Sequence, residues 1–248
     1  MIEGLLTTVV AIFAYFLLPN GLGSVKFLSP EERAWALQRL ADEKPAANLP
    51  EDGDVSGAEL FKWSEVRRGA FSPQTLLTAS AYFGILSGLY SFGLFLPTII
   101  NDLGYTANSA QLWSVIPYAV ACVATVVVAF VSDRLKVRGI VMLCTLPIAI
   151  IGYAAIANIS SSPSHYRTKY GMTFLMATGL YSSVPPVLVW ISNNSAGHYK
   201  RATATALQLA IANCGGFVTV FVYPKKQGPQ YHKGHTIILS LLCYGWFA

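Results

Sequence analysis

The sequence predicts an all-α, polytopic membrane protein, and three observations lead to this fold class. First, the 29 Lys, Arg, Asp and Glu residues of the 248-residue chain leave long uncharged runs between them. Second, six of these runs contain 22 residues or more, whereas a helix that crosses a hydrocarbon core of about 30 Å needs about 20 mostly apolar residues. Third, only 12% of the residues are charged, and a soluble domain has about 25%.

The uncharged runs define seven candidate spans, which we number 1 to 7 along the chain. Spans 1 to 6 are long enough to cross a bilayer, and span 7 is too short. The runs are 4–25, 69–101, 103–132, 139–166, 170–199, 202–224 and 234–248. We therefore expect six membrane-spanning helices and part of a seventh.

The long segment between spans 1 and 2 contains signals for two short helices. Ser29 to Glu32 forms a capping box with proline at the first helical position, and good helix formers follow it. A second capping box, Ser56 to Glu59, opens a helix through Phe61, Trp63 and Val66. Both helices are expected at the membrane surface, either as solvated tethers or, in the alternative interpretation, as regulatory elements.

The basic residues predict the orientation of the spans. Loops 20–72, 133–138 and 197–201 together hold 12 of the 17 Lys and Arg residues, and the loops between them hold five. Because Lys and Arg accumulate in cytoplasmic loops, the first set of loops is placed inside. Span 1 is then expected to run from outside to inside.

Several classes of protein are excluded by what the sequence lacks. The four cysteines all lie in apolar runs, where we expect them to be small buried hydrophobic residues instead of disulfide partners or zinc ligands. The usual metal, dinucleotide and phosphate motifs do not occur, and no basic stretch interleaved with aromatics suggests nucleic acid. We expect no cofactor, no metal, no catalytic residues and no nucleic-acid partner, so the chain is not expected to be an enzyme.

Several motifs together resemble a known family. They are the loop sequence Phe27-Leu28-Ser29-Pro30-Glu31-Glu32-Arg33-Ala34-Trp35, the stretch Trp63-Ser64-Glu65-Val66-Arg67-Arg68, the end of span 2 at Leu96-Pro97-Thr98-Ile99-Ile100, the loop from Ser132 to Gly139, the stretch from Trp190 to Arg201, and Asn213-Cys214-Gly215-Gly216. The chain resembles the major facilitator superfamily of transporters. More narrowly, it is similar to the fungal anion:cation symporters related to allantoate and nicotinate permeases.

The resemblance implies an organisation along the chain. Residues 1–19 would be family helix 6, residues 20–72 the cytoplasmic loop between two bundles, and residues 73–248 family helices 7 to 12 with the last one truncated. Helices 1 to 5 would be missing, so transport would require the N-terminal six-helix half as a partner. The implied location is the plasma membrane, as a multi-pass protein in the lipid bilayer.

The resemblance also points to spans 2 and 5 as the lining of the substrate path. The candidate substrate-binding residues are Tyr82, Tyr90, Tyr181, Ser182, Trp190, Asn193 and Asn194. Pro185-Pro186 is expected to break span 5, and irregular backbone in a membrane is tolerated where it lines a cavity or is buried in protein. The alternative role of each side chain is helix packing or an interfacial aromatic belt. For the amides Gln208 and Asn213 in span 6 we favour hydrogen bonding between helices.

A charged cluster follows span 3. Asp133 at a helix end can accept charge-assisted hydrogen bonds, and Arg134 and Arg138 can donate them to carboxylates or helix C-termini. In the superfamily such a cluster resembles a conformational latch that favours the outward-facing state. The alternative is a solvated inner loop, which explains the basic residues but not the aspartate.

The expected function is transport of a small organic anion, such as an allantoate-, nicotinate- or vitamin-like carboxylate. Alternating access between two bundles, coupled to protons, would drive it in the complete protein. Apart from Glu3, no acidic or basic residue is expected inside a span, so a cation for the substrate would come from the missing half. The alternative is a truncated or degenerate fragment without transport activity, or a half-transporter that depends on a partner.

Overall fold

A computed structural model describes the chain at residues 2–18, 25, 27–42, 61–102, 104, 106–160, 162–224, 226 and 231–248. These residues form helices and connecting turns, and no strand occurs among them. The chain divides into two compact units, residues 1–60 and residues 61–248, which we describe separately.

The first unit contains two helices, α1 (Ile2–Leu17) and α2 (Pro30–Asp42). The predicted capping box at the start of α2 is confirmed, because the Ser29 amide donates to Glu32 Oε2 (2.9 Å) and the Glu32 amide donates to Ser29 Oγ (3.2 Å). Hydrogen bonding of the Glu32 carboxylate, first to the Ser29 backbone amide and then to the Ser29 side chain, lowers the pKa of Glu32 below its usual range. The sequence signal therefore places the start of α2 correctly.

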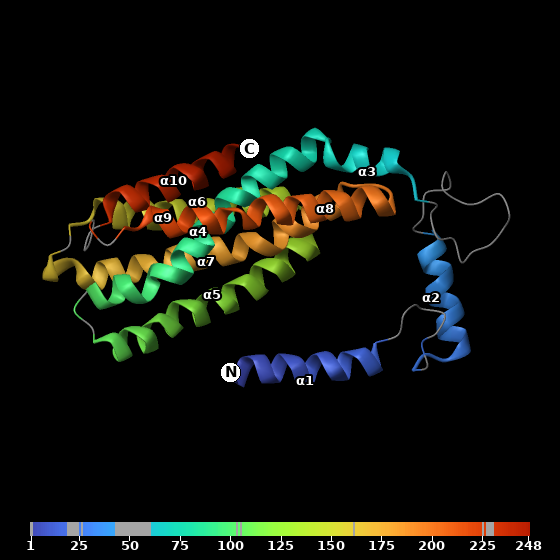
Figure 1. Ribbon diagram of the computed structural model, residues 1–248, viewed down its shortest axis with the longest axis horizontal. Helices are drawn as coiled ribbons and strands as arrows, with labels where there is room; N and C mark the ends of the chain where they lie inside the picture. The colour runs from blue at the N-terminus through green and yellow to red at the C-terminus, as the bar shows by residue number, and fades with distance from the viewer. Residues whose placement is uncertain are drawn as a thin grey trace. The chain divides into compact units, whose positions relative to one another are not determined.

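The second unit contains the remaining helices, shown in Figure 1. They are α3 (Trp63–Ala70), α4 (Pro73–Asp102), α5 (Ala107–Leu135), α6 (Arg138–Asn158), α7 (Tyr166–Asn193), α8 (His198–Asn213), α9 (Gly215–Val222) and α10 (His232–Phe247), with a short 3₁₀ turn at Pro163–His165. Among the residues that the structure describes, five stretches are long and apolar enough to cross a membrane: α4, α5, α6, α7, and α8 together with α9. The predicted all-α, polytopic fold class is confirmed.

Helices α4 and α7 form the centre of the second unit. Helix α4 packs against α5, α7, α8, α9 and α10, and helix α7 packs against α4, α5, α6 and α8. Helices α6 and α10 pack against each other and cover one side of this central pair. Helices α5 and α8 do not pack extensively against each other, so within this unit the described helices leave the side of the bundle between them uncovered. We call it the open side.

Glycines allow the closest helix contacts in the core. A Cβ atom added to Gly179 of α7 would lie 2.3 Å from the amide nitrogen of Ala149 on α6, and one added to Gly84 of α4 would lie 2.5 Å from the carbonyl oxygen of Leu241 on α10. Small residues of this kind let helix backbones approach each other in a membrane. Gly84 and Gly179 are therefore positions of close packing between helices.

Span 6 is long and apolar enough to cross a membrane, as expected, but it consists of two helices. Helix α8 ends at Asn213 and α9 begins at Gly215, which packs tightly on Ser87 of α4. The expected break in span 5 was wrong, because α7 continues through Pro185 and Pro186 although each proline removes one helical hydrogen bond. Helix α7 packs against both α5 and α6, and backbone groups freed by proline are tolerated in a membrane where they are buried in protein.

The expected burial of the cysteines was also wrong. Cys122, Cys144 and Cys214 are exposed and Cys243 is partly exposed, and all four are free thiols. A thiol is apolar enough for a surface that faces hydrocarbon, so an apolar sequence run does not distinguish the two positions. The predicted second capping box lies outside the described residues; α3 itself begins at Trp63 without a side-chain cap.

The contact at Gly179 leads to a stability prediction. We expect Gly179→Ala to destabilise the bundle by about 1–3 kcal/mol, because the added methyl group must push α6 away from α7. Gly171→Ala on the same helix is the matched control: its Cβ meets no atom within 4 Å, so helix propensity should stabilise it by up to about 1 kcal/mol. Thermal unfolding of the purified protein in detergent measures both. Equal melting temperatures for the two variants would contradict the close contact.

Candidate functional site

The open side presents polar side chains from four different helices. Tyr90 lies on α4, Tyr118 on α5, Tyr181 on α7 and Asn213 on α8. The three tyrosines are partly exposed and the asparagine is exposed. We call these four residues the open-side cluster.

Contacts between neighbouring helices hold the open-side cluster in place. The Tyr90 hydroxyl donates to Asn213 Oδ1, and Asn213 Nδ2 donates to the Leu209 carbonyl oxygen (2.7 Å), so the amide is used at both ends. The rings of Tyr118 and Tyr181 meet edge to face with centroids 5.8 Å apart. A Cβ atom on Gly93, one turn after Tyr90, would lie 3.8 Å from the Tyr118 hydroxyl, so Tyr118 approaches α4 next to Tyr90.

The structure separates the residues that the sequence proposed for substrate binding. Only Tyr90 and Tyr181 belong to the open-side cluster. Tyr82 is buried in the hydrophobic core, and Ser182 is buried with no hydrogen-bond partner for its hydroxyl oxygen among the described residues. A buried polar atom of this kind retains hydrogen-bonding capacity for water or a ligand.

The other candidates on α7 lie away from the cluster. Trp190 follows Tyr181 by nine residues, or about two and a half helical turns, so the two side chains lie on opposite sides of α7. Trp190 lines a separate cavity of about 210 Å³ together with Trp246. Asn194 Nδ2 donates to the Trp190 carbonyl oxygen (2.8 Å) at the end of α7, and Asn193 is exposed there. None of these three residues belongs to the open-side cluster, so their predicted role in substrate binding stays a prediction.

The two amides of span 6 connect helices, as expected. Gln208 of α8 is buried and its Nε2 donates to the Val187 carbonyl oxygen on α7 (3.4 Å), while its Oε1 has no partner among the described residues. Asn213 accepts from Tyr90 and so connects α8 to α4. Both contacts agree with a role in fixing α8 against the central pair.

The predicted charged cluster lies where α5 turns into α6. Helix α5 ends at Leu135, Lys136 adopts the left-handed conformation (φ 57°), and α6 begins at Arg138. Arg138 Nη2 donates to Asp133 Oδ1 at 2.8 Å, and the Arg138 side chain is 19% exposed while that of Asp133 is 68% exposed. Arg134 is exposed. We call this end of the bundle, which also holds α3 and the turn between α7 and α8, the inner end.

The structure also reveals two buried ionisable residues that the sequence analysis missed. Lys169 lies inside α7 and is 3% exposed, and His235 lies inside α10 and is 1% exposed. The expectation that no basic residue lies within a span was therefore wrong. Lys169 directly precedes the uncharged run 170–199 that defined span 5, but α7 begins earlier, at Tyr166, and therefore includes Lys169. His235 was missed because only Lys, Arg, Asp and Glu were counted.

Aromatic residues surround His235. The Tyr223 hydroxyl and His235 Nδ1 lie 2.9 Å apart and share a hydrogen bond, and the ring of Tyr153 packs beside the imidazole with centroids 6.1 Å apart. Ionisable groups inside a membrane are costly, so a hydrogen-bonded pair such as this one marks a constrained position.

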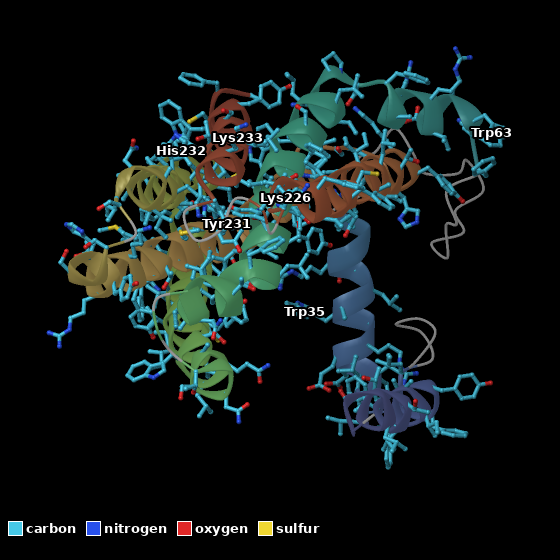
Figure 2. All side chains as sticks on the ribbon, turned by 60° about the vertical axis from the view of Figure 1, so that its left-hand side comes forward. Trp35, Trp63, Lys226, Tyr231, His232 and Lys233 are labelled. Carbon is cyan, nitrogen blue, oxygen red and sulfur yellow. The ribbon has the colours of Figure 1, made fainter. Side chains whose placement is uncertain are left out.

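The first turn of α10 is fixed to two neighbouring helices. His235 bonds to Tyr223 at the end of α9, and His232 Nδ1 lies 2.8 Å from the Ala157 carbonyl oxygen at the end of α6. Figure 2 shows His232 with Tyr231, Lys233 and Lys226 at this end of the bundle, opposite the inner end. We call it the outer end, following the predicted orientation.

Comparison with known proteins identifies the family. The family model described as Major Facilitator Superfamily matches residues 1–222. The chain belongs to the Major Facilitator Superfamily. The membrane-length helices and the resemblance noted in the sequence agree with this membership.

Fungal members of the superfamily are similar to the whole chain. An uncharacterised transporter of Schizosaccharomyces pombe is 30% identical over 100% of this chain and 47% of its own length, and a second one is 32% identical over 95% and 44%. The high-affinity nicotinic acid transporter of Saccharomyces cerevisiae is 28% identical over 100% of this chain and 44% of its own length. The chain therefore spans about half the length of these relatives, and all three are named as transporters.

The buried pair at the outer end yields a second prediction. Tyr223→Phe should destabilise the protein by about 1–3 kcal/mol, because His235 Nδ1 would stay buried without its partner. Tyr244→Phe is the matched control, since its hydroxyl bonds Ser80 (3.2 Å) from an exposed position and its loss should cost much less. Thermal unfolding in detergent compares them.

The double variant Tyr223→Phe/His235→Phe tests the same hydrogen bond by removing both of its partners. Replacing both partners by apolar residues should recover part of the lost stability. If Tyr223→Phe melts together with Tyr244→Phe, the buried hydrogen bond does not contribute as the structure indicates.

Proposed function

We propose that this chain forms the C-terminal half of a transporter that carries a small organic anion across the membrane by alternating access. A planar carboxylate such as nicotinate is the proposed substrate, with protons as the coupling ion. The similarity to the nicotinic acid transporter supports the substrate class, because it extends over the whole chain. The observation that carries the proposal is the open-side cluster, which gathers polar and aromatic groups from α4, α5, α7 and α8 on an uncovered side.

The open side is unsuited to lipid as its neighbour. Hydroxyl and amide groups are costly in hydrocarbon, so such a face is expected against a water-filled path or another protein surface. Small residues at Ala202, Ala206 and Ala210 on α8 are exposed in this chain, although such residues usually permit close helix packing. Both features fit a second six-helix bundle facing the open side, as in transporters built from two halves.

The chemistry of the open-side cluster suits a planar, uncharged ring better than a bare charge. The rings of Tyr118 and Tyr181 offer aromatic surfaces, and the hydroxyl groups and the Asn213 amide offer hydrogen bonds. The cluster itself contains no cation. A basic residue for the carboxylate is therefore proposed to come from the other half of the transporter.

The substrate path is tested by uptake. In the complete transporter we expect Tyr90→Phe and Tyr181→Phe to raise the KM for nicotinate, by up to about tenfold for the loss of one hydrogen bond worth about 1.4 kcal/mol. Trp190→Phe and Asn194→Ala are the matched controls, because both residues lie away from the open side. Labelled nicotinate uptake, normalised to the amount of protein at the cell surface, measures these effects.

The opposite pattern of KM values would place the substrate path on another face of the bundle. A raised KM in the Trp190 and Asn194 variants, with unchanged Tyr90 and Tyr181 variants, would support the assignment made from sequence resemblance. Absence of nicotinate uptake by the unchanged transporter, with uptake of another organic anion, would overturn the proposed substrate but retain the path.

We further propose that the Asp133–Arg138 ion pair acts as the conformational latch of the complete transporter. Asp133→Asn should lower the population of the outward-facing state relative to the inward-facing state by up to about fivefold. This limit corresponds to the loss of an exposed ion pair that contributes up to about 1 kcal/mol. Alkylation of a cysteine introduced at Tyr90 by a membrane-impermeant reagent measures this population in a background without other cysteines. Glu65→Gln, which breaks the Glu65–Arg68 pair at the same end, is the control. Equal alkylation rates in both variants would assign Asp133 to loop stability alone.

A further inference from the structure

Helix α3 is held on the inner end of the bundle by one face. A Cβ atom on Gly69 would lie 2.8 Å from the Lys200 carbonyl oxygen, so α3 lies directly against the first turn of α8. The ring of Phe61, just before α3, meets the ring of Tyr199 edge to face at 5.3 Å. Val66 and Glu65 on the same face are partly buried. The position of α3 is therefore fixed by packing.

The opposite face of α3 is exposed and combines aromatic with basic side chains. Trp63 is 70% exposed and Phe71, directly after the helix, is 76% exposed. Arg67 lies between them at four-residue spacing, so the three side chains form one stripe, and exposed Arg68 lies next to it. Figure 2 shows Trp63 at the N-terminal end of α3. We call these four residues the α3 face.

The membrane surface is the expected location of this face. Only Phe71 and Ser72 separate α3 from α4, which is a membrane-length helix. The 30 residues of α4 extend about 45 Å, longer than a hydrocarbon core of about 30 Å. The first turns of α4, and α3 before them, therefore lie at the level of the lipid headgroups.

The charge at the inner end is strongly positive. The described basic residues there are Lys62, Arg67, Arg68, Arg134, Lys136, Arg138, Lys200 and Arg201. The described acidic residues at this end are Glu65 and Asp133, and each forms an ion pair with an arginine, Arg68 (3.1 Å) or Arg138 (2.8 Å). No side chain in the described part of the chain forms an ion pair with Arg67. The α3 face is thus complementary to a negatively charged surface.

We propose that the α3 face is a docking site for anionic phospholipids of the inner membrane leaflet. Trp63 and Phe71 enter the boundary between headgroups and acyl chains, where amphipathic aromatic rings are favoured. Arg67 and Arg68 donate charge-assisted hydrogen bonds to the lipid phosphates and carboxylates. Lipid binding on this face holds α3 at the membrane surface while its other face positions the start of α8.

A lipid fits this face better than another protein segment does. Protein interfaces rarely bury cations without acidic partners, whereas a headgroup layer supplies both anionic groups and an apolar layer directly beneath them. The stripe of aromatic, basic and aromatic residues matches this layering along a single helix face. A protein occupant is therefore an alternative that the experiment must separate.

Quenching of Trp63 fluorescence tests the proposal on the full chain in lipid nanodiscs. Bilayers contain phosphatidylserine and phosphatidylcholine in fixed proportion, with bromine on the acyl chains of one lipid or the other. The signal that disappears in Trp63→Phe isolates this residue from the other four tryptophans. We expect brominated phosphatidylserine to quench this signal at least twofold more than brominated phosphatidylcholine at equal mole fraction. In Arg67→Gln/Arg68→Gln the ratio should fall to about one.

A second pair of substitutions controls for net charge. Arg167→Gln/Lys233→Gln removes the same charge at the outer end, where both residues are exposed, and should keep the twofold ratio. Absence of quenching by either lipid would mean that protein or water covers the α3 face, which overturns the proposal. Equal quenching by both lipids in the unchanged protein would show apolar contact without anionic selectivity, and would overturn it as well.

Discussion

The structure depends on one constraint: hydrocarbon offers no hydrogen bonds, so every polar group in a span must find its partner within the protein or face a polar space. The bundle meets this constraint largely within single helices. Ser87 and Ser183 donate their hydroxyls to carbonyl oxygens one turn earlier, at Phe83 and Gly179. Thr145 and Ser183 also pair across α6 and α7 at 2.8 Å. Polar side chains that remain exposed or partly exposed, such as those of the open-side cluster, indicate where the lipid ends.

Close packing is the second requirement for helix association in a membrane, because lipid tails are as apolar as the side chains that they would replace. Helices in the bundle associate because their surfaces fit, and the fit is tightest where a glycine meets backbone. Gly179 against Ala149 and Gly84 against Leu241 bring α6, α7, α4 and α10 together on the covered side. The side without such contacts is the one that displays tyrosines and an amide.

Among the described residues, spans 2 to 6 correspond to membrane-length stretches, whereas α1 in span 1 is shorter, at 16 residues. The sequence was sufficient for the fold class, because the cost of burying charge in a membrane separates helices from loops. It was not sufficient for the direction in which each residue faces. A helix surrounded by lipid and protein is apolar all round, so periodicity does not distinguish its faces. Tyr181 and Trp190 were therefore predicted to form one site, although they lie on opposite sides of α7. Lys169 was missed because the uncharged run begins just after it, although α7 begins at Tyr166, and His235 was missed because histidine was not among the residue types that defined the runs.

The interruption at Cys214 divides one membrane crossing into two parts with different attachments. Helix α8 is tied to α3, to α7 and, through Asn213, to α4. Helix α9 instead rests on α4 through Gly215, and its end is tied to α10 through Tyr223. Both parts pack on α4, but α8 also packs against α3 and α7, whereas α9 packs against α10. Tilting of α8 about Cys214 would change the inner half of the open side while the outer end keeps its hydrogen bonds.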